Sequence, residues 1–173
     1  MSWKEASVDA GSQLGISHTH SRIHRGVTFV AGEDIADLDI ATPRIYGITT
    51  GPVLKPHIIF NVVASLGILV QLYYGSSFSA GTSIAAVNRN FASSKTASMA
   101  IVHSPTGVTL GTLGPAGRIY TSGAGNGGSV QAGGQLRNDD EFVLATSSLY
   151  ILRVVAEADN AKVFVTMGWY EEG

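Results

Sequence analysis

The chain has 173 residues, no cysteine, and a formal net charge of −2 from 11 basic and 13 acidic residues. Its length suits one domain with a substantial core, and the lack of cysteine excludes disulfides, thiolate metal sites and a cysteine nucleophile. The near-neutral balance provides no general attraction to nucleic acid, and 45% hydrophobic residues exclude a chain that is disordered by composition.

The first 22 residues are predicted to form an extended N-terminal arm. They are polar, contain several serines, and carry one large aromatic residue, Trp3. Terminal segments of this composition attach loosely to the domain behind them. The chain is therefore divided into an arm, 1–22, and one domain, 23–173. The arm also lacks the apolar stretch of a secretory signal.

Apolar and polar side chains alternate in short segments throughout the domain, which is the pattern of β-strands. Alternate residues share a strand face: Ile58, Phe60 and Val62 oppose Ile59, Asn61 and Val63, and Ile68, Val70, Leu72 and Tyr74 oppose Leu69, Gln71 and Tyr73. Both faces are fairly apolar, so these two strands are predicted to lie inside a two-layer core. Val163, Val165, Met167 and Trp169 likewise alternate with Phe164, Thr166 and Tyr170. Weaker patterns predict strands at 27–31, 35–40, 44–49, 96–103, 108–113, 118–121, 141–145 and 149–155.

The connections between these strands are predicted from turn residues. The uncharged run 58–74 is interrupted by polar and glycine residues, so we interpret it as two buried strands joined by a turn at 64–67 rather than as a membrane helix. The polar residues 157–161 are predicted to join the last two strands as a hairpin. The glycine-rich stretch 114–134 is predicted to be a long loop.

These patterns define the fold class. No long segment has an apolar period of 3.6 residues, and no unit repeats at a solenoid period. Regular short strands separated by turns are typical of sandwiches and barrels. We predict an all-β fold, an antiparallel β-sandwich of the jelly-roll type with an extended N-terminal arm.

Three histidines form the first candidate metal site. His18, His20 and His24 would point to one side if their segment were a strand. Three imidazoles on one face can bind zinc or another transition metal. A metal site also needs neighbouring groups that orient the rings, and the sequence offers none nearby. We therefore predict polar arm residues and no metal, with the three-histidine site as the alternative.

Two further motifs have local explanations. Gly123–Gly128 has the spacing G-x-G-x-x-G, but the residues that follow cannot open the helix that a dinucleotide site requires. The acidic group Glu33, Asp34, Asp37 and Asp39 lacks the order of a calcium-binding loop and is predicted to be a solvated strand edge. The chain has no Gly-x-Ser-x-Gly elbow. We predict no catalytic residues and no cofactor.

Two segments carry a resemblance to a known class of protein. The first is Tyr73-Tyr74-Gly75 followed by the run Val87–Thr96, VNRNFASSKT. The second is Ala132–Leu144, AGGQLRNDDEFVL, followed by Tyr150–Val154 and the closing Trp169-Tyr170-Glu171-Glu172. Over residues 56–172 this order resembles small virion structural proteins of tailed bacteriophages, in particular capsid decoration, or cement, proteins.

The resemblance implies a function without catalysis. Such proteins are sandwich domains that bind the major capsid protein on the outer capsid surface as homotrimers and stabilise the head. They are made in the host cytoplasm and act without nucleic acid or a membrane. The alternative is a tail or head-fibre module that binds a host-surface glycan, for which Tyr73, Tyr74 and Tyr120 would be exposed aromatic candidates.

Four residues are candidates for contacts with the capsid or a neighbouring subunit. Trp3 is the expected anchor of the arm, because aromatic residues carry a large share of interface energy. Arg89 lies between two asparagines that favour a turn, and it is expected to fix the next strand or to dock a neighbour through Asp139 or Asp140. A solvated surface arginine is the alternative.

Overall fold

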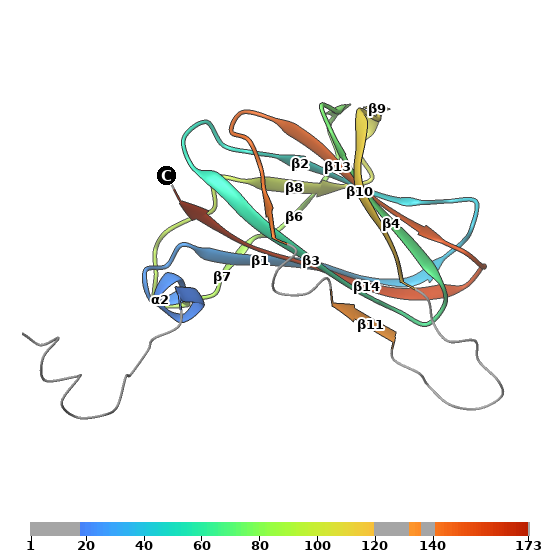
Figure 1. The fold of residues 1–173 in the computed structure, drawn as a ribbon, viewed down its shortest axis with the longest axis horizontal. Helices are drawn as coiled ribbons and strands as arrows, with labels where there is room; N and C mark the ends of the chain where they lie inside the picture. The colour runs from blue at the N-terminus through green and yellow to red at the C-terminus, as the bar shows by residue number, and fades with distance from the viewer. Residues whose placement is uncertain (1–17, 120–131, 136–140, 173) are drawn as a thin grey trace, which may run out of the picture.

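The structure is a computed structural model, and it describes residues 18–119, 132–135 and 141–172. Within these ranges the chain is an antiparallel β-sandwich (Figure 1). Sheet A has the order β11 (Ala132–Gln135), β3 (Lys55–Ala64), β14 (Ala161–Glu172), β1 (Thr28–Leu38) and β7 (Val87–Asn88), with β12 (Phe142–Val143) also on β3. Sheet B has the order β10 (Thr112–Ile119), β4 (Ile68–Tyr74), β13 (Leu149–Ala156), β2 (Arg44–Thr49), β8 (Ala100–His103) and β6 (Thr82–Ile84).

The predicted C-terminal hairpin is wrong. β13 pairs with β2 and β4 in sheet B, whereas β14 pairs with β1 and β3 in sheet A. The short connection between them therefore crosses from one sheet to the other. Both strands have an apolar face, and this crossing lets the two faces meet across the core instead of lying in one layer.

The same crossing occurs at β1 to β2 and at β3 to β4. Consecutive strands that alternate between two sheets are compatible with a jelly roll, which interleaves two Greek keys. The antiparallel sandwich is confirmed, and the finer jelly-roll assignment stays a prediction.

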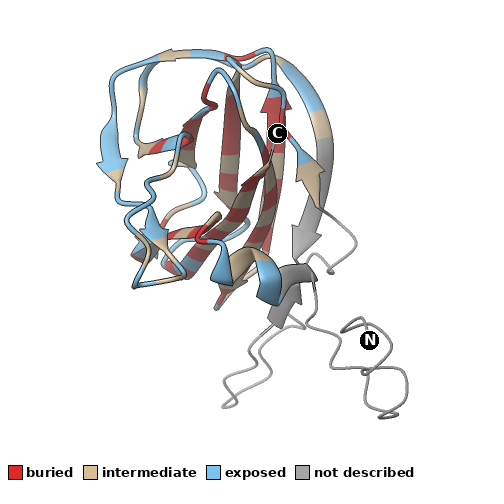
Figure 2. Cartoon of the chain, turned by 90° about the vertical axis from the view of Figure 1, so that its left-hand side faces the viewer, coloured by how far each residue is buried: buried red, intermediate tan, exposed pale blue. Residues whose placement is uncertain are grey.

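The core lies between the two sheets. Along β3 and β14, every second residue is buried, and Figure 2 shows buried positions alternating with less buried ones along the central strands. The largest fully buried side chains include Trp169, Tyr46 and Phe60. Each such side chain contributes about 1.5–3 kcal/mol through removal of apolar area from water. The predicted two-layer core is confirmed. The strand faces that carry Phe60 and Leu72 lie inside it, whereas Tyr74, at the end of β4, is half exposed.

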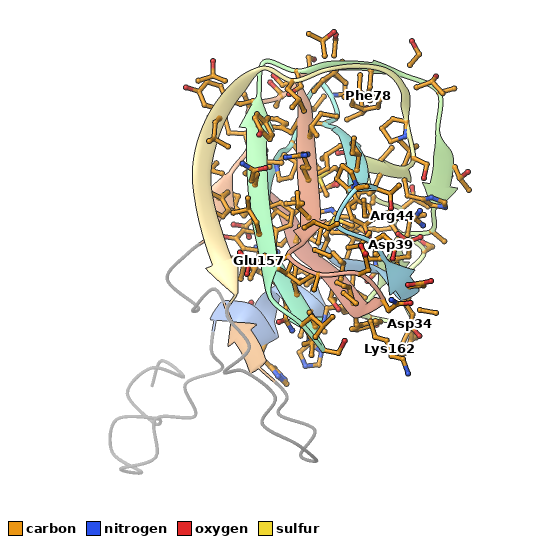
Figure 3. The ribbon with its side chains drawn as sticks, turned by 90° about the vertical axis from the view of Figure 1, so that its right-hand side faces the viewer. Asp34, Asp39, Arg44, Phe78, Glu157 and Lys162 are labelled. Atoms are coloured by element: carbon orange, nitrogen blue, oxygen red, sulfur yellow. The ribbon has the colours of Figure 1, made fainter. Side chains whose placement is uncertain are left out.

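A smaller cluster lies on the outer face of sheet B. Gly47, Ile151 and Tyr73 are neighbours across β2, β13 and β4, and both Ile151 and Tyr73 are buried. β5 (Ser77–Ser79) pairs with β9 (Thr106–Thr109) and packs near β13. A Cβ placed on Gly47 would come within 2.6 Å of the Phe78 ring, so Phe78 covers this cluster directly above the glycine. Figure 3 shows Phe78 near the end of the strands opposite to Asp34 and Lys162.

Two predicted irregular segments contain regular structure. Residues 18–24 form helix α2 (His18–His24), which lies beside β7 in Figure 1, so the extended arm cannot reach residue 22 as predicted. A seven-residue helix is marginal alone and needs tertiary contacts. In the predicted glycine loop, residues 114–119 continue β10 and residues 132–135 form β11. Glycine has no side chain to show the alternation of a strand, yet the backbone of β10 pairs with β4 and that of β11 pairs with β3.

Candidate functional site

The outer face of sheet A carries a groove of about 680 Å³. Its floor comes from the three central strands of the sheet, β3, β14 and β1. The strand register places three rows across them, namely His57, Tyr170 and Thr28, then Ile59, Gly168 and Val30, then Asn61, Thr166 and Gly32. We call this feature the sheet A groove; Arg22, Arg89 and Glu141 complete its lining.

A polar network closes one end of the sheet A groove. The Tyr170 hydroxyl donates to Glu141 Oε1 at 2.5 Å and lies 2.8 Å from His57 Nδ1, which also contacts that carboxylate. The Tyr170 ring stacks on His57 with 4.5 Å between centroids. The Arg22 guanidinium lies 3.5 Å from the centroid of the Tyr170 ring. Burial and the bond to Glu141 raise the pKa of Tyr170 to about 12, so the hydroxyl remains a donor at neutral pH.

Helix α2 is attached at the same end of sheet A. Arg22 Nη2 lies 3.2 Å from Glu172 Oε2, and Arg25 Nη1 lies 3.1 Å from Glu172 Oε1. The hydrogen bond from Arg22 is the main reason that the pKa of the Glu172 carboxyl is lower than usual. These contacts explain why residues that sequence patterns assign to an arm become helical here: their partners lie at the far end of the chain.

Other polar groups of the groove lining have no described partner. Thr28 is only 6% exposed, and neither its hydroxyl nor the buried Oδ1 of Asn61 has a hydrogen-bond partner among the described residues. Arg89 is exposed and makes no ion pair with any residue that the structure describes. Its backbone N–H donates to the Thr28 carbonyl at 2.9 Å. A Cβ built at Gly168 would meet no atom within 4 Å, so the floor is open there.

The Asn-Arg-Asn turn forms as its residue types predict. Asn88 Oδ1 accepts from the Asn90 N–H at 2.9 Å, and Asn90 Oδ1 accepts from the Ala92 N–H at 3.1 Å. The Asn88 amide also donates to the carbonyls of Gly26 and Lys95, which fastens both ends of the loop. These bonds tie the loop 88–95 to its own backbone and to Gly26. At its tip Phe91 is 89% exposed.

The other sequence-predicted contact residues are not brought into this site. Trp3, Asp139, Asp140 and Tyr120 lie outside the described residues, so the pairing of Arg89 with either aspartate stays a prediction. Tyr73 is buried and is not the exposed aromatic that the glycan alternative needs.

The side chain of His18 lies outside the described part of the structure, and the described side chains of the histidine and acidic motifs form no metal cluster. His20 and His24 lie on one face of α2 with 2.9 Å between their Nε2 atoms, which is helical rather than strand spacing. Glu33 pairs with Arg44, and Asp39 accepts from the Asn160 N–H, so these two acidic residues have structural partners. Asp34 and Asp37 are exposed on the half of β1 that β7 does not cover, as the strand-edge prediction expects.

Glu171 is a buried carboxylate that belongs to none of the candidate site motifs of the sequence. It is 3% exposed and accepts hydrogen bonds from the Ser98 and Met99 N–H groups and from Trp169 Nε1, at 2.9–3.1 Å. Its partners are all structural, so it fixes the segment before β8 to the end of β14. The sequence signal for Glu171 is its position: it is a charged residue that follows Trp169 in the row of alternate buried residues of β14.

Comparisons with known proteins give no relative: no family model, curated protein or solved structure matches the chain. In the described ranges, no helix has the length and apolar composition needed to span a membrane.

Proposed function

We propose that this chain is a non-enzymatic structural protein of a tailed-phage virion. In this role it is a capsid decoration protein that binds the major capsid protein on the outer head surface as a homotrimer and stabilises the head. The resemblance over residues 56–172 suggests the role. The observation that carries it further is the loop 88–95, which presents an exposed aromatic side chain from a fixed backbone.

This loop has the properties of an interface anchor. Aromatic side chains dominate the energy of protein interfaces, and a contact costs less entropy when its backbone is already ordered. Phe91 is 89% exposed, yet its neighbours Asn88 and Asn90 bind local backbone groups. A single exposed apolar residue is ordinary, but one held at the tip of a fastened loop is arranged for contact.

The experiment combines a cryo-EM map of virions that carry the protein with one pair of variants. We expect density at three-fold positions of the capsid. Phe91→Ser should reduce capsid binding or trimer formation at least ten-fold and leave the melting temperature unchanged. Val53→Ser is the matched control, because Val53 is 75% exposed and lies on a different loop. Density confined to the tail, or equal binding by both variants, would refute the proposal.

A second candidate is the tail or head-fibre module that binds a host-surface glycan. The observation that favours it is the sheet A groove, because concave surfaces with a few convergent polar groups are typical ligand sites. Its volume of about 680 Å³ is within the range of small-ligand pockets. The Tyr170 ring in the groove is already covered by Arg22 and His57, and Tyr74, which is half exposed, is not part of the groove lining.

A further inference from the structure

The unpaired polar atoms of the sheet A groove define what a ligand must supply. Thr28 Oγ1 and Asn61 Oδ1 are buried without a partner among the described residues, although a buried unpaired polar group is destabilising. The amide oxygen needs a donor, and the hydroxyl can donate or accept. Thr28 and Asn61 lie two strands and four residue positions apart, about 16 Å at the usual strand spacings, so an oligosaccharide with several hydroxyl groups is needed to reach both atoms.

The floor of the groove adds an apolar requirement. Ile59 and Val30 flank Gly168 on neighbouring strands, and the missing side chain at Gly168 leaves room above the sheet. The C–H face of a pyranose ring can lie on such a floor. A peptide strand fits less well, because β3, β14 and β1 are interior strands whose backbone groups pair with each other.

Charge differs between the two sides of the groove. Glu141 lies next to β12 and Arg89 follows β7, so the two residues stand on opposite sides of the three floor strands, about 19 Å apart at the usual strand spacing. Glu141 is bonded to Tyr170 and His57, and Arg22 is bonded to Glu172. Arg89 is therefore the guanidinium of this lining that no described carboxylate neutralises, and it suits a carboxylate or sulfate group.

We propose that the sheet A groove binds an acidic saccharide, with sugar hydroxyls on Thr28 and Asn61 and the anionic group on Arg89. This inference rests on the glycan-binding candidate and names its ligand class and orientation. The Glu141 side of the groove then takes neutral hydroxyl groups, because a second anion there would be repelled.

The test uses the whole chain and matched sugars. Isothermal titration calorimetry should detect binding of glucuronic-acid- or sialic-acid-terminated oligosaccharides, at least ten-fold tighter than their neutral counterparts, and the difference should shrink at high salt. Equal affinity for acidic and neutral sugars would overturn the acidic inference and leave the glycan role intact. No binding of either at millimolar concentration would overturn both. A protein that binds an acidic peptide but no saccharide would also refute the inference.

Three variants locate the site. Gly168→Leu should abolish binding while the fold is kept, because its side chain enters open space and a strand glycine is unfavourable. Arg89→Gln should remove the preference for acidic sugars and keep the neutral affinity. Thr28→Val should weaken binding without lowering the melting temperature, because the hydroxyl has no described partner to lose. Lys162→Ala, on β14 beyond the groove lining, is the control. Unchanged binding in Gly168→Leu would place the ligand elsewhere and refute the proposal.

Discussion

Glu171 provides the sharpest test of the structural reasoning. Its carboxylate accepts from three N–H donors, two of them backbone groups at Ser98 and Met99. Replacement by Leu leaves these donors without an acceptor in a buried position. At about 1–3 kcal/mol for each orphaned donor, Glu171→Leu should cost about 3–9 kcal/mol, a large share of the 5–15 kcal/mol typical of a domain.

Glu171→Gln should cost less, about 2–3 kcal/mol, because one oxygen remains but the charge assistance is lost and the amide faces the Ser98 N–H. The assay is urea unfolding followed by tryptophan fluorescence. Glu172→Gln is the matched control, since its carboxylate forms partly exposed ion pairs that contribute less than about 1 kcal/mol each. If all three substitutions cost less than about 1 kcal/mol, Glu171 does not fasten β8 to β14 and the reasoning fails.

Three further outcomes are expected. Gly47→Ala should lower stability by about 1–3 kcal/mol, because the new Cβ would displace the Phe78 ring; calorimetry that shows no loss would contradict the placement of Phe78. Glu172 has a lowered pKa when folded, so its contribution is present above the ordinary value of 4.5 and disappears as the pH falls through the lowered value. Unfolding measured from pH 7 to pH 3 should show this loss, and Arg22→Ala should reduce it. Trp3→Ala should weaken capsid attachment and leave the unfolding curve unchanged; equal binding in a pull-down would exclude the arm as an anchor.

The strand faces were predictable because they depend on a local pattern. Ile58 and Phe60, or Val163 and Val165, occupy alternate positions of an extended backbone, and that geometry alone places them on one side. Burial then follows from their apolar character. The turn around Arg89 was predictable for a similar reason, since asparagine side chains bond to backbone two residues away.

The site was not predictable in this way. The site combines four separate segments, which carry Arg22, His57, Glu141 and Tyr170. His57, Glu141 and Tyr170 meet because β3 pairs with both β12 and β14, and Arg22 joins them because α2 is attached to Glu172. None of them belongs to a motif with a fixed spacing. The sequence indicates Arg89 as a candidate contact residue, but its place beside an open groove depends on the pairing of β7 with β1.

By itself, the sequence determined that the chain is built of strands, which residues share a face of each strand, and where several of the turns lie. Only the tertiary structure decided that β13 and β14 separate into different sheets and that residues 18–24 coil into a helix against Glu172. Periodicity is set by neighbours one or two residues away along the chain. Strand pairing and the attachment of α2 depend instead on contacts between distant segments, which compete with every other pairing that the same apolar faces would allow.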